Sequence, residues 1–198
     1  MQARQVFSAY LRGPAEEHPW RYCPSCSKPL ERCEDPESAM RCVDPSCRSI
    51  HFRNPVPIVA IMVVSGNRVL LCKRRAGTLN EGEWCLPCGY IEFDEDFLTA
   101  GRREVKEETG LDVAITSILS VASNFLRSDL HTLAVALLAT PTGGLMQAGS
   151  DVDDVAWFTV GDPLPKLAFS ADSHMIERYF ATRLPGAPVD PLYSGSAS

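Results

Sequence analysis

The chain has 198 residues, of which 45% are hydrophobic and 22% are charged, and its formal net charge is −6. This balance is typical of one globular domain with a small appendage. The negative charge argues against nucleic acid as the main partner, because binding a phosphate backbone needs a basic face. It does not exclude a phosphorylated small molecule that is held through divalent cations.

The sequence contains no signal for a membrane or a secretory route. No apolar run approaches the ~18 residues of a membrane span, and the first residues lack the continuous apolar core of a signal peptide. We therefore expect a cytoplasmic protein with no membrane partner. In that compartment the eight cysteines favour reduced thiols and a metal over a disulfide framework.

The first quarter of the chain is expected to contain two parts. Residues 1–21 have weak periodicity, and we expect a short helix or an N-terminal arm there. Residues 22–53 are rich in turns and cysteines, and no apolar run among them is long enough to build a core. A metal is the usual means of holding so short a segment, so we expect a small metal-bound domain.

The cysteine spacing in this segment predicts a zinc ribbon. The four candidate ligands form two knuckles, Cys23 with Cys26 and Cys42 with Cys47. Four thiolates complete a tetrahedral Zn²⁺ site and leave no open position, so such a zinc is structural. The second knuckle is longer than the common two-residue spacing, and Cys33 and His51 are competing ligands. We expect metal removal to unfold residues 22–53 and to spare chemistry elsewhere.

A larger domain is expected over residues 54–184, followed by a flexible tail at 185–198. Its first elements are two apolar strands, residues 56–64 and 68–74, on either side of a short turn, which predicts a β-hairpin. Three further strands are expected at residues 111–123, 131–140 and 155–160. Strands and helices alternate along the chain, so we expect an α/β domain with a mixed sheet.

Two helices are predicted within this domain. Residues 95–109 have apolar side chains at helical spacing, and Gly110 stands where a helix C-cap belongs. Residues 169–184 are expected to form a closing helix, with Ser170 or Asp172 available as its N-cap.

The first of these helices carries a cluster of carboxylates. Glu104, Glu107 and Glu108 stand at positions i, i+3 and i+4, so their side chains share one helical face. Such a face is either a solvated acidic surface or a site for Mg²⁺ or Mn²⁺, which prefer oxygen ligands and bridge phosphate oxygens. Arg102 and Arg103 precede the cluster and can pair with one of the carboxylates.

The residues around this helix resemble the Nudix box, G-x5-E-x7-R-E-U-x-E-E-x-G-U with U aliphatic. The match covers residues 89–111 and holds at every defined position: Gly89, Glu95, Arg103, Glu104, Val105, Glu107, Glu108, Gly110 and Leu111. The preceding Trp84-x-Leu86-Pro87 is similar to the lead-in of this family. Cys88 departs from the family pattern, in which a small residue usually stands before the glycine.

The resemblance implies a Nudix fold, a mixed sheet between helices with the box forming a loop–helix–loop, preceded here by the zinc ribbon. It also implies a hydrolase that cleaves a nucleoside diphosphate linked to another moiety, often as a homodimer. The implied Mg²⁺ or Mn²⁺ ligands are Glu104, Glu107 and Glu108, with the Gly89 carbonyl as an additional one. Arg103 would orient the glutamates, and Glu95 would support the loop or a second metal.

The mechanism implied by this resemblance is hydrolysis of the pyrophosphate by water that bound metal ions activate. The general base is either Glu104 or a carboxylate from a later loop. Asp151, Asp153 and Asp154 form such a loop before a strand, although they can equally be a solvated turn.

Several segments bear on the substrate. The order of a zinc ribbon followed by a Nudix domain is similar to that of NADH pyrophosphatases and of ADP-ribose/FAD pyrophosphatases. The former carry a Ser-Gln-Pro-Trp-type motif after the box, whereas this chain has SNFLRSDLHTL at residues 123–133. VLLCKR and KLAFSADSHMIERYF resemble the ADP-ribose/FAD group, so ADP-ribose or FAD is the expected substrate. Phe125 is a candidate to stack on adenine, and Arg74 and Arg75 are candidates to reach a phosphate.

Three alternatives remain at this point. One is an NADH pyrophosphatase. Another is a catalytically silent Nudix and zinc-ribbon binding module. The third is a redox protein that uses Cys85 and Cys88, which requires a helix beginning at the second cysteine and a lowered thiol pKa.

Overall fold

The computed structural model describes residues 1–11, 19–34, 39–149 and 151–190. The chain divides into two compact units, one formed by Met1–Ala9 with Val56–Ser198 and the other by Tyr10–Pro55. The residues expected as an N-terminal arm are therefore shared between the two units. Within the first unit, β1 (Val6–Ser8) is a strand, which the weak periodicity of this stretch did not predict.

The larger unit is built on a nine-stranded mixed sheet with the main order β1-β9-β10-β5-β6-β11. The predicted hairpin is present as β5 (Val56–Ser65) and β6 (Arg68–Arg74), with Gly66 at φ 62° in the turn. The remaining long strands are β9 (Leu111–Arg127), β10 (Leu130–Gly144) and β11 (Val152–Thr159). The pairing of β10 with β5 is parallel, and that of β10 with β9 is antiparallel. The expected mixed α/β sheet is confirmed.

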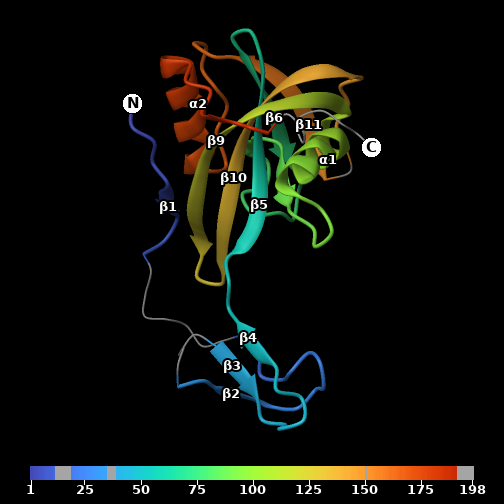
Figure 1. Ribbon diagram of the computed structural model, residues 1–198. Coiled ribbons are helices and arrows are strands. Elements are labelled where there is room, and N and C mark those ends of the chain that lie inside the picture. Colours follow the sequence, from blue (N-terminus) through green and yellow to red (C-terminus); the bar gives the residue numbers. More distant parts are fainter. Residues whose placement is uncertain (12–18, 35–38, 150, 191–198) are drawn as a thin grey trace. The chain divides into compact units, whose positions relative to one another are not determined.

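Two helices, α1 (Phe97–Thr109) and α2 (Ser170–Thr182), lie on opposite faces of this sheet (Figure 1). The core on the α1 side contains Val105 together with Val59 and Leu137 of the central strands. The core on the α2 side contains Ile176 and the alternate residues of the same strands. This division follows from the two-residue period of a strand, which sends successive side chains to opposite faces.

Short strands attach further segments to the main sheet. Strand β7 (Trp84–Cys85) pairs with β6, and β8 (Cys88–Tyr90) pairs with β5. Strand β12 (Ala187–Pro188) pairs with Ser117 and Ile118 of β9, so the described part of the expected tail is attached to the sheet. Residues 191–198 of that tail lie outside the described residues.

The smaller unit contains a three-stranded antiparallel sheet in the order β2-β3-β4, formed by β2 (Leu30–Arg32), β3 (Ala39–Cys42) and β4 (Ile50–Phe52). Apart from cysteines, its described buried core contains one apolar side chain, Ala39. The four cysteines of the predicted knuckles lie around this sheet. The unit therefore resembles a metal-held ribbon far more than a hydrophobic miniature domain.

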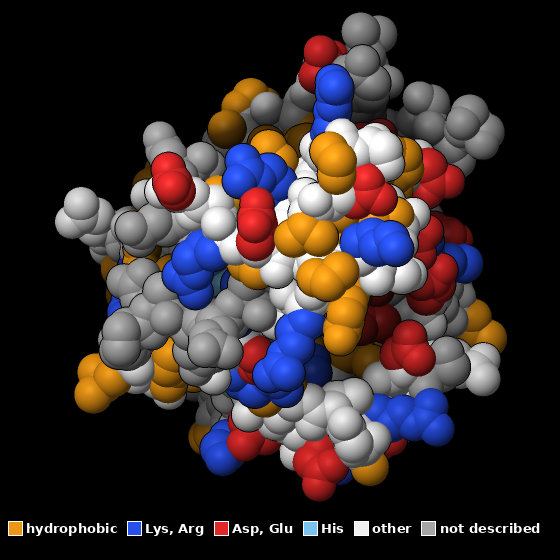
Figure 2. Space-filling model, turned by 90° about the horizontal axis from the view of Figure 1, so that it is seen from below, with side chains coloured by type: hydrophobic (Ala, Val, Ile, Leu, Met, Phe, Trp, Pro, Cys, Tyr) orange, Lys and Arg blue, Asp and Glu red, His pale blue; other side chains and the backbone are white. Residues whose placement is uncertain are grey.

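The face of the molecule in Figure 2 carries interspersed acidic, basic and apolar side chains. Neither sign of charge is gathered into one field there. Within the described part of the chain, neither helix is long and apolar enough to cross a membrane.

Candidate functional site

Helix α1 is fixed at both ends, which sets the direction of its carboxylates. Asp96 is the N-cap, and its Oδ1 accepts the backbone N–H groups of Leu98 and Thr99 at 2.8 and 2.9 Å. Gly110 is the C-cap in the left-handed region at φ 72°, and its N–H bonds to the Lys106 carbonyl. The predicted helix and its glycine cap are confirmed, and the Asp96 cap is an addition from the structure.

Arg103 is the centre of the carboxylate cluster. Its guanidinium donates to both Glu95 oxygens, to Glu104 Oε1 at 2.8 Å and to Glu107 Oε2 at 3.1 Å. It also donates to the Tyr90 carbonyl at 3.0 Å, which ties the helix to strand β8. The hydrogen bonds that Arg103 donates to Glu95 raise the pKa of Arg103 and lower the pKa of Glu95. One cation therefore orients three carboxylates, as its planar five-donor fork permits.

Glu108 is the most buried member of the cluster. Its Oε2 accepts the Cys88 N–H at 3.1 Å. Burial raises the pKa of Glu108 to about 8, although the Cys88 N–H favours the charged form. Burial also raises the pKa of Glu104, against the attraction of Arg103. Two carboxyl groups are thus held where their charge is unfavourable without a further cation.

Gly89 brings strand β8 against this cluster. A Cβ atom at position 89 would lie 2.1 Å from the Glu104 carboxyl group, so only glycine leaves room for that carboxylate. The close approach explains in physical terms why a glycine stands at the first position of the motif. It also places the backbone of β8 beside Glu104 and Glu108.

The chain following β10 closes against the last turn of α1. The N–H groups of Gln147 and Gly149 bond to the carbonyls of Thr109 and Glu108 at 2.9 and 3.0 Å. A Cβ atom at Gly149 would lie 1.8 Å from the Glu107 carbonyl oxygen, so this contact again requires glycine. These backbone contacts, which the sequence analysis missed, support the turn that carries Glu107 and Glu108.

The aspartates considered as an alternative base lie at the start of β11. Asp153 and Asp154 are exposed, and Asp154 Oδ1 accepts the N–H of Val155 at 2.8 Å. Asp151 is also exposed. None of the contacts of Asp153 and Asp154 joins them to the glutamates.

The oxygen cluster fits a divalent cation in its charge and donor chemistry. Three carboxyl groups, those of Glu95, Glu104 and Glu107, contact one guanidinium, and the Glu108 carboxyl bonds to the Cys88 N–H of the neighbouring strand. The pKa values of Glu104 and Glu108 are raised. Mg²⁺ and Mn²⁺ prefer carboxylate and carbonyl oxygens. Such an ion would offset the excess negative charge that Arg103 leaves.

The smaller unit brings its four predicted ligands together. The sulfur atoms of Cys23, Cys26, Cys42 and Cys47 all lie within 4.8 Å of one another. The Cys23–Cys47 and Cys26–Cys42 pairs are 3.8 and 3.4 Å apart, close to the ~3.8 Å edge of a tetrahedron with Zn–S bonds of about 2.3 Å. This four-sulfur cluster is suited to structural zinc.

The two competing ligands lie outside the four-sulfur group. His51 Nε2 lies 3.3 Å from Cys23 Sγ, within hydrogen-bond distance, and Cys33 is not part of the group. Each knuckle closes with one residue in the left-handed region, Ser27 at φ 60° and Arg48 at φ 54°. These turns direct both sulfurs of a knuckle to the same side.

The redox interpretation of Cys85 and Cys88 is wrong on both of its requirements. Cys85 is buried in β7, and Cys88 begins strand β8 instead of a helix. The hydrogen bond with Cys85 and burial both raise the pKa of Cys88 well above the usual thiol value. A nucleophilic dithiol needs the opposite shift.

A cavity of about 390 Å³ lies beside the carboxylate cluster, on the α2 side of the sheet. Cys88 and Gly89 line one part of it, and Arg74, Phe169 and Asp172 line another. Phe125, the aromatic residue expected at adenine, does not line this cavity; its ring stacks on His131 at a centroid distance of 4.0 Å. Phe169 and Asp172 were missed as site residues, because nothing in the local pattern separates them from ordinary helix-start residues.

Comparison with known proteins agrees with this geometry. Residues 54–179 match the NUDIX domain family. An ADP-ribose pyrophosphatase of Methanocaldococcus jannaschii is 35% identical over 119 residues, which are 60% of this chain and 69% of that protein. The NAD-capped RNA hydrolase NudC of Stutzerimonas stutzeri is 31% identical over 179 residues, which are 88% of this chain and 60% of that protein.

Solved structures give the same assignment. A NUDIX hydrolase from Nitrosomonas europaea superposes with a TM-score of 0.72 at 27% identity, over 86% of this chain and 96% of that one. An ADP-ribose pyrophosphatase from Streptococcus suis, at 22% identity and a TM-score of 0.52, covers 67% of this chain and 98% of its own and supports the fold alone.

The mixed sheet between two helices, with the glutamate-bearing helix α1 after strand β8, agrees with the fold of the solved NUDIX hydrolase. The family match covers more than half of the chain, and the chain therefore belongs to the Nudix hydrolase family.

Proposed function

We propose that this protein hydrolyses the pyrophosphate bond of a nucleoside diphosphate linked to another moiety, with ADP-ribose or FAD as substrate. The observation that carries the proposal is the Arg103-centred cluster, in which two partly or fully buried glutamates face strand β8. A site that holds carboxyl groups close together, where burial makes their charged forms unfavourable, is suited to phosphate chemistry assisted by a bound cation.

In this proposal the residues have three roles, and Glu104 has two of them. Glu104, Glu107 and Glu108, with the Gly89 carbonyl, hold Mg²⁺ or Mn²⁺, which when bound neutralises phosphate charge and activates water. Arg103 and Glu95 position these groups. We assign the general base to Glu104, since Asp153 and Asp154 are exposed and Asp154 is engaged by a backbone N–H.

The choice of ADP-ribose is supported by the relative from M. jannaschii, whose name states that activity. The absence of the Pro-Trp pair from residues 123–133 argues against NADH. A second candidate is nonetheless an NADH- or NAD-type pyrophosphatase, because the similarity to NudC covers 88% of this chain, considerably more than the similarity to the ADP-ribose enzyme.

A phosphate-release screen tests the proposal. Purified protein is incubated with Mg²⁺ or Mn²⁺ and with ADP-ribose, FAD, NADH, NAD⁺ and diadenosine polyphosphates. We expect turnover of ADP-ribose or FAD above the others, and we expect Glu108→Gln to remove at least 99% of it without loss of folded structure, because the amide cannot replace a carboxylate ligand. Glu177→Gln, on the exposed face of α2, is the matched control.

No activity on any of these substrates would favour the silent binding module. Near-normal rates for Glu108→Gln would overturn the residue assignment even if the enzyme is active. Preference for NADH would favour the second candidate.

A further inference from the structure

Small side chains of the sheet form part of the lining of the cavity beside the glutamates. Four of them are alanines from three neighbouring strands: Ala60 of β5, Ala134 and Ala136 of β10, and Ala122 of β9. Ala136 pairs directly with Ala60, and Ala134 pairs directly with Ala122. A surface of methyl groups on adjacent strands has the shape and polarity to accept the face of a planar ring.

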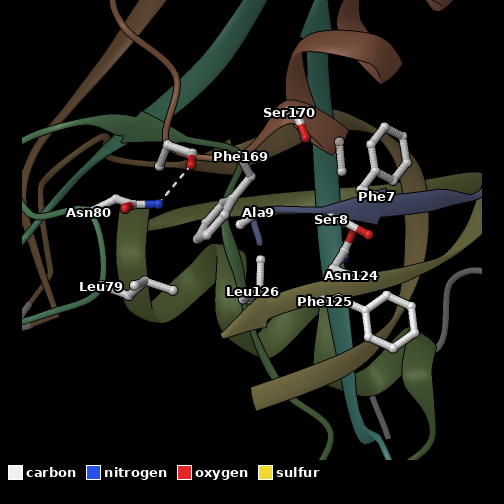
Figure 3. Close-up of a pocket in the computed structure, with 12 residues that line it drawn as sticks. Phe7, Ser8, Ala9, Leu79, Asn80, Asn124, Phe125, Leu126, Phe169 and Ser170 are labelled. Carbon is white, nitrogen blue, oxygen red and sulfur yellow. Dashed lines mark hydrogen bonds between the residues drawn. The ribbon is translucent and has the colours of Figure 1, made fainter. Parts of the chain in front are cut away.

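An aromatic ring stands at the wall of this cavity. Phe169, the residue before α2, lines this cavity and also a smaller neighbouring pocket, which Figure 3 shows. There its ring lies near Leu126, with Leu79 and Asn80 on one side and Ala9 on the other. The Arg74 guanidinium lies over the Phe169 ring at 5.1 Å. Arg74 is itself anchored by a hydrogen bond to the Leu79 carbonyl. Phe169 is therefore a fixed apolar wall.

One charged side chain is enclosed in the cavity wall with unused bonding capacity. Asp172 is only 4% exposed, and its Oδ2 accepts the Leu86 N–H at 3.1 Å. Its other oxygen has no hydrogen-bond donor among the described residues, and Asp172 is a lining residue of the cavity. An oxygen without a partner on this buried side chain can accept a hydrogen bond from a ligand.

A second polar group points to the same kind of ligand. Asn124 is buried in the cavity lining, with its Nδ2 3.5 Å from Thr132 Oγ1. Its Oδ1 has no partner among the described residues. When Asp172 is ionised, both unpartnered atoms are acceptors, so the ligand that they suit presents N–H groups.

The cavity also reaches the catalytic residues. Cys88 and Gly89 belong to its lining, while the Cys88 N–H holds Glu108 and Gly89 abuts Glu104. A ring in the cavity therefore leaves the attached diphosphate beside the glutamates, within a single substrate.

We infer that this cavity binds the planar heterocycle of the substrate, with Asp172 accepting a hydrogen bond from an amino or carboxamide N–H group of the ring. The inference rests on the proposed function for the identity of the substrate as a nucleotide. Adenine and nicotinamide both provide such a group, and Asp172 is a specificity-determining residue for either. The four alanines contact the face of the ring, and Phe169 contacts its edge.

Binding of mononucleotides tests this inference separately from catalysis. Calorimetric titrations at pH 8.5 with Mg²⁺ compare AMP with IMP, in which a carbonyl replaces the amino group. A second pair compares nicotinamide mononucleotide with nicotinate mononucleotide, in which a carboxylate replaces the carboxamide. The wild-type protein is expected to prefer the amino or amide member of at least one pair by about tenfold, the value of one hydrogen bond. The pair that shows the preference identifies the ring.

Asp172→Asn is the informative variant. Its carbonyl can still accept the Leu86 N–H, but its amide then directs a donor into the cavity in place of an acceptor. The preference is therefore expected to reverse toward IMP or nicotinate mononucleotide, which a general loss of folding would not produce. Asp162→Asn, at an exposed aspartate, is the control and keeps the wild-type preference.

Two outcomes overturn the inference: no saturable binding of any of the four mononucleotides, or a preference that Asp172→Asn leaves unchanged. A reversed preference in a protein without pyrophosphatase activity would support the ring site and reject the proposed hydrolase function. If Asp172→Asn loses pyrophosphatase activity but keeps the wild-type preference between the mononucleotides, the ring site is rejected and the hydrolase function is supported.

Discussion

Arg103 determines how the carboxylates of α1 face strand β8. Its side chain contacts three carboxylates and one backbone carbonyl, which requires donors in several directions at once. Lysine has the same charge but a single nitrogen, so it can satisfy only part of this set. The geometry of the cluster therefore depends on the guanidinium and not on positive charge alone.

We predict that Arg103→Lys lowers kcat/KM by about 10- to 100-fold, the usual effect of losing a residue that orients metal ligands. The Mg²⁺ concentration for half-maximal rate should rise as well, because the carboxylates lose their common orientation. Steady-state kinetics over a Mg²⁺ series measure both effects. Arg102→Lys, at the neighbouring position, is the control, and equal kinetics for the two variants would contradict the positioning role.

The residues of the cluster could be predicted because their spacing along one helix determines their common face. In the structure Glu104 and Glu107 both accept hydrogen bonds from Arg103, and Glu108 accepts one from the Cys88 N–H. Phe169 and Asp172 could not be predicted as cavity residues. Their position depends on how α2 packs against β7 and the sheet, which no local pattern in the sequence records.

At the scale of elements, α2 is anchored differently from the sequence expectation. Its N-cap residue is Phe169, which makes no side-chain cap hydrogen bond, so neither Ser170 nor Asp172 caps the helix as expected. Asp172 instead accepts the Leu86 N–H from the segment between β7 and β8. The Asp172 carboxylate therefore bonds to a residue far away in the sequence and does not cap its own helix. This hydrogen bond joins α2 to the segment that precedes the Nudix box.

This anchoring makes the stability of the fold depend on pH. Burial raises the pKa of Asp172 to about 7, although the Leu86 N–H favours the charged form. Because the folded-state pKa lies above the unfolded value, the contribution of the neutral carboxyl is complete below about pH 4 and is lost as the pH rises to about 7. Above that range the penalty for the buried charge is constant.

We therefore predict that Asp172→Asn, which does not titrate, becomes more stable relative to wild type as the pH rises from about 4 to about 7. The difference should reach at most about 4 kcal/mol, the equivalent of a shift of three pH units. Urea unfolding of both proteins at several pH values measures it. Parallel stability curves for the two proteins would contradict the assignment, and Asp162→Asn provides the baseline.

The strands themselves were predictable, whereas their arrangement was not. Residues 56–64 and 68–74 were expected as a hairpin and are present as β5 and β6. The parallel pairing of β5 with β10 brings together segments far apart in the chain. The same pairing places Ala136 beside Ala60 in the lining of the cavity.

At the scale of the whole molecule, the four-sulfur cluster and the glutamate cluster belong to different units. The smaller unit has almost no apolar core of its own, so its fold is expected to depend on the metal. The larger unit has two extensive cores and does not share that dependence.

We predict that the purified protein contains one zinc per chain, and that chelation renders residues 22–53 sensitive to protease. Pyrophosphatase activity, assayed after the chelator is replaced by Mg²⁺, should remain within about twofold of the starting value, because the four cysteines and the glutamates belong to different units. Metal analysis and limited proteolysis measure these effects. Cys42→Ser should lose the zinc, and Cys33→Ser should keep it, since Cys33 lies outside the four-sulfur group. A protease-resistant metal-free ribbon would contradict the prediction.

Because the ribbon is a compact unit of its own, we expect the larger unit to tolerate its replacement. Residues 10–55 leave the larger unit after β1 and return to it at β5, so the ribbon is an insertion in a loop of that unit. Opening the ribbon turns a folded insertion into a flexible connection between the same two points. The closure entropy of such a loop changes by only about 0.6 kcal/mol for each doubling of its length. A Gly/Ser linker in place of the ribbon should therefore preserve the pairing of β1 with β9, which makes the ribbon an exchangeable module.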